Sequence, residues 1–186
     1  IVLGKTNLSE WANYMDPQMP NGFSALGGQT RNPYGPYDTY GSSSGSAVAA
    51  AANFAAATVG SETQGSLIAP AGINSVVALK PSLGLVSRDY VIPLLDWQDT
   101  PGPMGRTVSD VAVLLTGMTG VDNNDPSTRD ATALTGVDFA QFLKPEAAAN
   151  LRIGVQVYTD GDVEQMINDT GIKPEDSGEL RKALEA

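Results

Sequence analysis

The chain contains neither cysteine nor histidine among its 186 residues. Without cysteine it cannot supply thiol catalysis, disulfide bonds or thiolate metal sites. Without histidine it cannot supply a Ser-His-Asp triad or the usual imidazole ligands of zinc. A serine nucleophile here would need another base, and the common remaining choice is a lysine with a lowered pKa.

Basic residues are also scarce, since 11 Lys and Arg stand against 21 Asp and Glu, for a formal net charge of −10. This argues against binding to nucleic acid or to an anionic membrane, because both need a basic face. No apolar run approaches the length of a membrane span, and Asn53 interrupts the longest alanine-rich segment. Residues 1–4 lack the basic start and apolar core of a signal peptide, so a cytoplasmic location is the default expectation.

The length of 186 residues suits a single domain with a sizeable core. The chain does not begin with Met, and residues 179–186 continue a helical pattern without a stop signal. We therefore expect residues 1–186 to be one incomplete domain of a longer protein.

The most unusual stretch runs from residue 41 to residue 70 and consists largely of small side chains. It opens with a serine-rich turn at 41–46, continues as an alanine-rich segment at 47–57 and ends in a second turn at 60–66. Alanine is the best helix former and the serines can cap a first turn, so we predict a buried helix at 47–57. Backbone N–H groups and hydroxyls from both turns could then meet, which predicts a site.

Other segments have simpler signals. Thr107 and Asp110 form a capping box ahead of a periodic apolar face, which predicts a helix that Gly120 ends. Apolar runs predict short strands at 1–3, 76–79, 85–87, 90–92 and 151–158, while residues 15–40 and 122–135 are predicted to be loops. Asp122, Asn124 and Asp130 lack the glycine and the terminal glutamate of an EF-hand, so no metal site is expected.

The serine-rich turn alone allows three interpretations. Residues 41–45 match the G-x-S-x-G elbow with Ser43 as nucleophile, but that elbow needs a preceding strand and a histidine. A Gly/Ser turn before a helix can bind phosphate, but the Gly-Lys-Ser/Thr ending of a P-loop is absent. The third interpretation is purely structural: a capped, buried helix that small residues allow to pack closely.

Several motifs occur in one order with tight spacing, and together they narrow these choices. They are the turn at 41–46, the alanine-rich segment, Gly60-Ser61-Glu62-Thr63-Gln64-Gly65-Ser66, Leu79-Lys80-Pro81, residues 84–88 and residues 98–104. This set resembles the amidase signature family of serine hydrolases, and residues 4–13 and 28–34 resemble its peptide-amidase branch. The resemblance covers residues 1 to about 128.

The resemblance implies an α/β fold with a mixed central β-sheet surrounded by α-helices, and a Ser-cisSer-Lys triad. By position, Ser66 would be the acylated nucleophile and Ser42 the bridging serine, reached by a cis peptide bond from Gly41 and supported by Ser43. The backbone N–H groups of Thr63, Gln64, Gly65 and Ser66 would form the oxyanion hole.

The family's lysine lies upstream of Gly4-Lys5-Thr6-Asn7, so we expect it before residue 1 and do not assign its role to Lys5 or Lys80. The expected activity of the full-length protein is hydrolysis of linear carboxamides through an acyl-enzyme, releasing a carboxylate and ammonia or an amine. This chain alone is expected to be inactive. A non-hydrolytic remnant of the fold that binds amides or a partner is the alternative.

The resemblance also implies a small-molecule or peptide amide substrate, no metal or organic cofactor, and a homodimer as one option for assembly. Gln64 departs from the aspartate or glycine usual in this branch. We expect its polar side chain to influence substrate preference.

Overall fold

The computed structural model describes residues 1–16, 18–144 and 146. Contacts divide the chain into two units, residues 1–143 and residues 144–186, and all the elements below belong to the first. The strand predicted at 151–158 lies outside the described residues, and the single-domain expectation stays a prediction. No helix in the described part of the chain is long and apolar enough to cross a bilayer.

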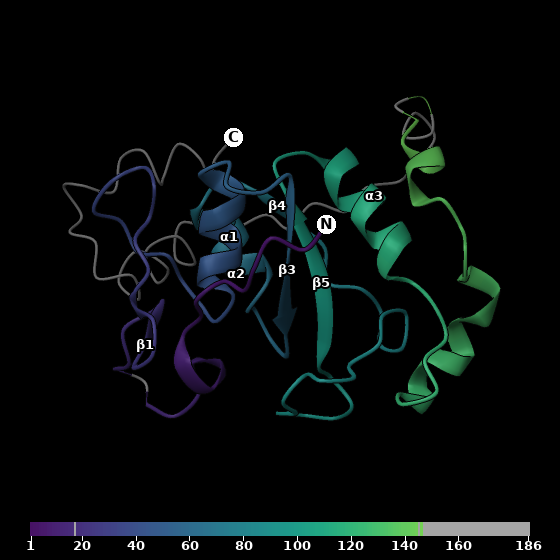
Figure 1. Cartoon of the computed structure of the whole chain (residues 1–186), viewed down its shortest axis with the longest axis horizontal. Helices are drawn as coiled ribbons and strands as arrows, with labels where there is room; N and C mark the ends of the chain where they lie inside the picture. Colours follow the sequence, from purple (N-terminus) through teal and green to yellow (C-terminus); the bar gives the residue numbers. More distant parts are fainter. Residues whose placement is uncertain (17, 145, 147–186) are drawn as a thin grey trace, which may run out of the picture. The chain divides into compact units, whose positions relative to one another are not determined.

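The first unit is built on a three-stranded antiparallel sheet in the order β3-β5-β4 (Figure 1). Strand β3 spans Ala57–Glu62, β5 spans Thr100–Gly105 and β4 spans Val77–Ala78. β3 and β5 pair over their whole length, whereas β4 pairs only with the last two residues of β5. All six residues of β5 are buried.

Three α-helices pack on this sheet: α1 (Ser44–Ala51), α2 (Ile68–Ile73) and α3 (Val108–Met118). In Figure 1, α1 and α2 lie to the left of β3 and β5, and α3 lies to the right. The α/β class predicted from the sequence is therefore confirmed. The core joins α1, the start of α2 and β5 through Ala47, Leu67, Ala71 and Met104, with Val76 and Ala78 packed against them.

Helix α3 begins as the sequence predicts. Thr107 Oγ1 accepts a hydrogen bond from Asp110 N (3.1 Å), and Asp110 Oδ2 accepts one from Thr107 N (2.9 Å). Hydrogen bonding to Thr107 also lowers the pKa of Asp110. The helix ends at Met118, two residues before Gly120.

The helix predicted at 47–57 is wrong in its second half. It ends at Ala51, Asn53 takes a left-handed φ of 61°, and Ala57 already begins β3. The second turn therefore shrinks to residues 63–66. Pairing of Ala57 with Gly105 of the distant β5 overrides the helix propensity of that alanine.

Strand β5 was not predicted, because Pro101 and Pro103 argue against a central strand. The carbonyl of Pro103 accepts from Leu79 N, so the backbone polar groups of both prolines face the side of β4. β4 pairs only with Met104 and Gly105 on that side, so the missing N–H groups of the prolines remove nothing from the pairing with β3.

Other strand and loop predictions need correction. Residues 1–3 are exposed and form no strand, 90–92 form none, and 85–87 contribute only the bridge of Val86 to Thr119. The predicted loops contain the hairpin of β1 (Phe23–Ser24) and β2 (Gly28–Gln29) and the 3-10 helix η2 (Pro126–Leu134). Two further 3-10 helices are η1 (Glu10–Asn13) and η3 (Phe139–Phe142).

The hairpin of β1 and β2 depends on Asn7. The Asn7 side chain hydrogen-bonds to Gly28 O, Thr30 Oγ1 and Ser24 Oγ, and local sequence patterns do not indicate these partners.

A buried ion pair anchors the segment that was predicted to be a surface loop. Asp125 is only 4% exposed and accepts hydrogen bonds from Arg88 Nε and Nη2, both at 2.9 Å. Arg88 N and Ser127 Oγ also donate to this carboxylate. Hydrogen bonds from Arg88 hold the pKa of Asp125 well below its usual range, and Asp125 raises the pKa of Arg88.

Replacing Asp125 with Asn should lower the free energy of unfolding at pH 7 by about 2–3 kcal/mol, because Arg88 loses its charged acceptor. Folding lowers this pKa, so the contribution is complete above the ordinary value of about 4 and is lost as pH falls below it. The loss should thus shrink between about pH 4 and pH 2. Urea unfolding measures it, with exposed Asp130→Asn as the matched control. A loss that does not change with pH would contradict the assignment.

Candidate active site

The two small-residue turns lie side by side, as the sequence predicts. The serine-rich turn leads into α1, the second turn follows β3, and Ser43 N donates to Ser66 O at 3.2 Å. Ser43 Oγ also donates to Ser61 O (3.0 Å) and accepts from Ser61 N (3.1 Å). The Ser43 side chain therefore hydrogen-bonds the edge of β3 as a neighbouring strand would.

Two other serines of the same turn have structural partners. Ser46 Oγ donates to Val59 O at 2.8 Å, further along the same edge of β3. Ser44 Oγ donates to Tyr40 O and lies 3.2 Å from Ser9 Oγ. By contrast, the hydroxyls of Ser42 and Ser66 have no hydrogen-bond partner in the part of the chain that the structure describes.

This division among the serines decides against Ser43 as the nucleophile of a G-x-S-x-G elbow. Its hydroxyl already donates and accepts, and residues 31–40 do not form the strand that such an elbow follows. The two uncommitted hydroxyls are the ones that the family resemblance assigns to the triad.

Ser42 follows a cis peptide bond from Gly41, which is the geometry expected of the bridging serine. Its carbonyl accepts from Ser9 N at 3.0 Å, and its side chain is 7% exposed. A β-carbon at position 41 would collide with Ser9 Oγ, so a larger residue there would require Ser9 to move.

The second turn exposes backbone donors. Gly65 has a φ of +78°, in the left-handed region that favours glycine, and a β-carbon there would meet nothing within 4 Å. The N–H groups of Gln64, Gly65 and Ser66 donate to no acceptor among the described residues. Successive free N–H groups beside open space are a suitable site for a negatively charged oxygen.

Ser42 and Ser66 line one small cavity of about 40 Å³, together with Ser61, Thr63 and other residues. A wider cleft of about 410 Å³ adjoins it and is lined by Gly41, Thr63, Gln64 and Ser66 on one side. Ser66 is 8% exposed and lines both cavities. None of the lysines in the described part of the chain lines either cavity.

The backbone of the second turn is supported by a charged pair that sequence reasoning missed. Glu62 Oε2 accepts from Leu67 N (2.7 Å) and Ile68 N (3.1 Å), which caps the start of α2. Lys80 Nζ lies 3.8 Å from Glu62 Oε1 and donates to Thr63 O at 2.5 Å. The sequence holds two signals for this pair. Glu62 is the one acidic residue among the small residues of 60–66, and Lys80 belongs to the Leu79-Lys80-Pro81 motif.

No group of three or more His, Cys, Asp or Glu side chains among residues 1–16, 18–144 and 146 is arranged to hold a metal ion. The expectation of chemistry without metal or cofactor stays a prediction.

Comparison with known proteins places these features in a family context. The family model described as Amidase matches residues 1–171. A probable amidase of Arabidopsis thaliana is 43% identical over 157 residues, covering 83% of this chain and 31% of the relative. A glutamyl-tRNA(Gln) amidotransferase component from Thermosynechococcus vestitus is 41% identical over 187 residues, covering 99% of this chain and 35% of that protein.

Among solved structures, the native peptide amidase of Stenotrophomonas maltophilia matches with a TM-score of 0.75 and 51% identity. The match covers 78% of this chain and 30% of that structure. The chain thus spans about a third of the length of the relatives that it matches.

The contrast between Ser43 and Ser42 can be measured as stability. Ser43→Ala should lower the free energy of unfolding by about 1–3 kcal/mol, because the N–H and carbonyl of Ser61 lose their partner. Ser42→Ala should change it by only about 0.5 kcal/mol, because that hydroxyl has no partner in the described part of the chain. Urea unfolding of the two variants makes the comparison, and equal losses would contradict it.

Proposed function

We propose that this chain, which belongs to the amidase family, carries the nucleophile and the oxyanion hole of an amide hydrolase. One observation carries the proposal: the uncommitted hydroxyls of Ser42 and Ser66 line the same cavity, beside unpaired backbone N–H groups. Such a site suits attack on a carbonyl carbon followed by stabilisation of the resulting oxyanion.

Ser66 is the proposed nucleophile. Its Oγ attacks the carbonyl carbon of the amide while its proton passes to Ser42 Oγ, and Ser42 gives its own proton to a neutral lysine. The electron pair of the C=O bond moves to oxygen, which accepts hydrogen bonds from the N–H groups of the turn at 63–66. Each such donor typically contributes about 10²–10³ in rate.

Collapse of the tetrahedral intermediate breaks the C–N bond. The leaving nitrogen takes a proton back through Ser42 and departs as ammonia or an amine, leaving an ester on Ser66. Water then attacks the ester by the same relay, which releases the carboxylate and restores Ser66.

Among the described residues, no lysine lines either cavity, so the base of the proposed relay has no candidate there. Lys80 donates to Thr63 O and lies against Glu62, and Lys5 is exposed outside both cavities. Among the described residues of the first unit, these lysines therefore do not reach the serines. We place the lysine upstream of residue 1 in the full-length protein, where the family resemblance expects it.

The proposed substrate is a linear carboxamide, either a small molecule or a peptide amide. The neutral side chains of Asn13, Gln64 and Gln98 line the wider cleft together with Leu94 and Leu95, and no charged residue of the described chain is among its walls. This lining suits an uncharged group next to the scissile amide. The similarity to peptide amidase supports the same substrate class.

A fluorophosphonate should label Ser66 in the full-length protein, because the probe reacts with an activated serine beside an oxyanion hole. Mass spectrometry of the digested protein locates the adduct. Ser42→Ala should slow labelling and kcat by about 10²–10⁴, because the proton relay is broken. Ser44→Ala is the matched control, and an adduct on Ser42, Ser43 or Ser46 would refute the assignment.

These 186 residues alone should release ammonia from a simple carboxamide at least about 10²-fold more slowly than the full-length protein, since general-base loss typically costs that much. The measurement compares both chains from neutral to alkaline pH. Similar rates would mean that one of Lys5, Lys80, Lys144, Lys173 and Lys182 acts as the base. Amide binding without turnover by the full-length protein would favour the non-hydrolytic alternative.

A further inference from the structure

We propose that Asp99 is a positioning residue that ties the oxyanion turn to the opposite wall of the substrate cleft. The inference rests on the proposed function, because it assigns a role in the same site. Asp99 is 6% exposed and immediately precedes β5, whose first residue, Thr100, pairs with Glu62 at the end of β3. This pairing places Asp99 beside Thr63, the first residue of the oxyanion turn.

The two carboxylate oxygens of Asp99 contact different parts of the site. Oδ1 accepts from Thr63 Oγ1 at 2.5 Å, which is in the range of short, charge-assisted hydrogen bonds. Oδ2 accepts from the backbone N–H groups of Leu94 (2.7 Å) and Leu95 (2.9 Å). One side chain therefore links two segments about thirty residues apart in the chain.

Thr63 is held from two sides by groups of opposite charge. Lys80 Nζ donates to its carbonyl oxygen, and Asp99 accepts from its hydroxyl. Rotation or translation of Thr63 breaks at least one of these bonds. Because the free N–H groups follow directly along the chain, the orientation of Thr63 sets the direction in which they point.

The segment on the other side of Asp99 lines the cleft. Leu94, Leu95 and Gln98 face the same opening as Thr63 and Ser66. The Asp99 carboxylate thus fixes the separation between the oxyanion donors and the wall against which the substrate packs. A misplacement of about 1 Å between reacting groups can cost about 10² in rate, so this separation matters for kcat.

A purely structural role would produce a different result. Loss of a hydrogen bond that only stabilises the fold lowers the free energy of unfolding and leaves the folded protein with normal kcat. A positioning role lowers kcat in protein that is fully folded, and it couples the effects of Asp99 and Thr63 because they act through one bond.

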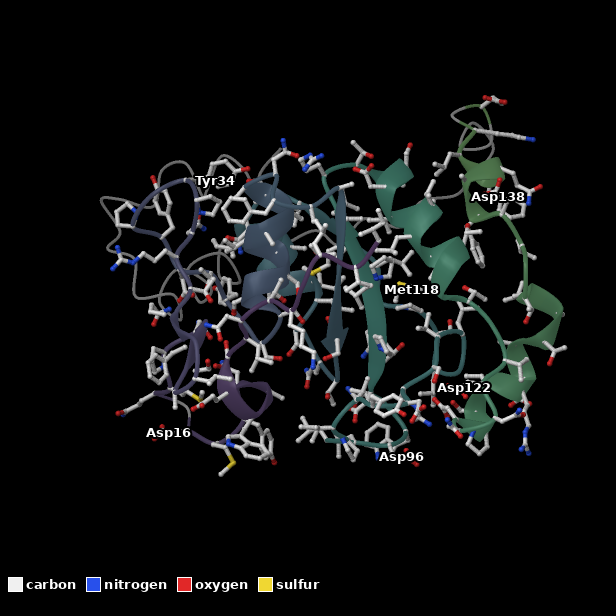
Figure 2. The ribbon with its side chains drawn as sticks, in the orientation of Figure 1. Asp16, Tyr34, Asp96, Met118, Asp122 and Asp138 are labelled. Atoms are coloured by element: carbon white, nitrogen blue, oxygen red, sulfur yellow. The ribbon has the colours of Figure 1, made fainter. Side chains whose placement is uncertain are left out.

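The first test is Asp99→Asn in the full-length protein, assayed on a simple carboxamide at a temperature where the variant is folded by circular dichroism. We expect kcat to fall about 10–100-fold. Asp96→Asn is the matched control, because Asp96, which Figure 2 labels, lies in the same segment before β5. Its side chain is 92% exposed and pairs with Arg88. The Asp96→Asn variant should keep normal kcat.

The second test changes the donor of the same hydrogen bond, Thr63. Thr63→Val removes the hydroxyl and should lose about as much kcat as Asp99→Asn, whereas Thr63→Ser keeps the hydroxyl and should lose much less. The double variant Thr63→Val/Asp99→Asn should be little worse than either single variant, because each change alone already breaks the link from Thr63 through residue 99 to Leu94 and Leu95. If Asp99→Asn does not fold, the comparison of Thr63→Val with Thr63→Ser tests the proposal alone.

Two outcomes would overturn the inference. The first is that Asp99→Asn has the same kcat as Asp96→Asn. The second is that the fold-losses of kcat caused by Thr63→Val and by Asp99→Asn multiply in the double variant. Both leave the proposed function intact, provided that the unmodified protein hydrolyses the amide and is labelled on Ser66. Failure of the unmodified protein in those assays refutes the proposed function itself.

Discussion

The antiparallel pairing of β3 with β5 is the constraint on which the rest of the site depends. Its register sets Glu62 opposite Thr100, so Thr63 and Asp99 leave the sheet together at the same end. The turn with the free N–H groups begins there, and so does the segment that lines the cleft. Because β3 pairs with β5 on one side only, its other edge remains available to the serines of the turn before α1.

The serine-rich turn divides its hydroxyls between structure and chemistry. Ser43 and Ser46 bond to the free edge of β3 and satisfy backbone groups that a further strand would otherwise satisfy. This anchoring lets α1 start against the sheet with small, buried residues. Ser42 is left as the hydroxyl that shares a cavity with Ser66. A run of similar residues thus has roles that differ by position, and each role follows from the partner that the fold brings to it.

Elements whose signals are local were predictable. The capping box of Thr107 and Asp110 and the apolar period after it identify α3, because every contact that starts a helix lies within one turn of chain. Elements that depend on distant partners were not predictable from the sequence. Strand β5 carries two prolines that fit only because β4 is short, and Ala57 joins β3 because Gly105 of β5 lies opposite it.

By itself, the sequence determined the class of fold and the residues to examine: ordered motifs single out Ser42, Ser66 and the turn at 63–66, and these 186 residues contain no histidine for a Ser-His-Asp triad. Only the tertiary structure decided which serine hydroxyls have no hydrogen-bond partner among the described residues, that Gly41 and Ser42 are joined by a cis bond, and that Lys80 and Asp99 both hydrogen-bond Thr63. The physical reason is the distance along the chain over which each interaction acts. Propensity and capping act within a few residues, whereas the hydrogen bond that Thr63 donates to Asp99 exists only once the sheet has formed.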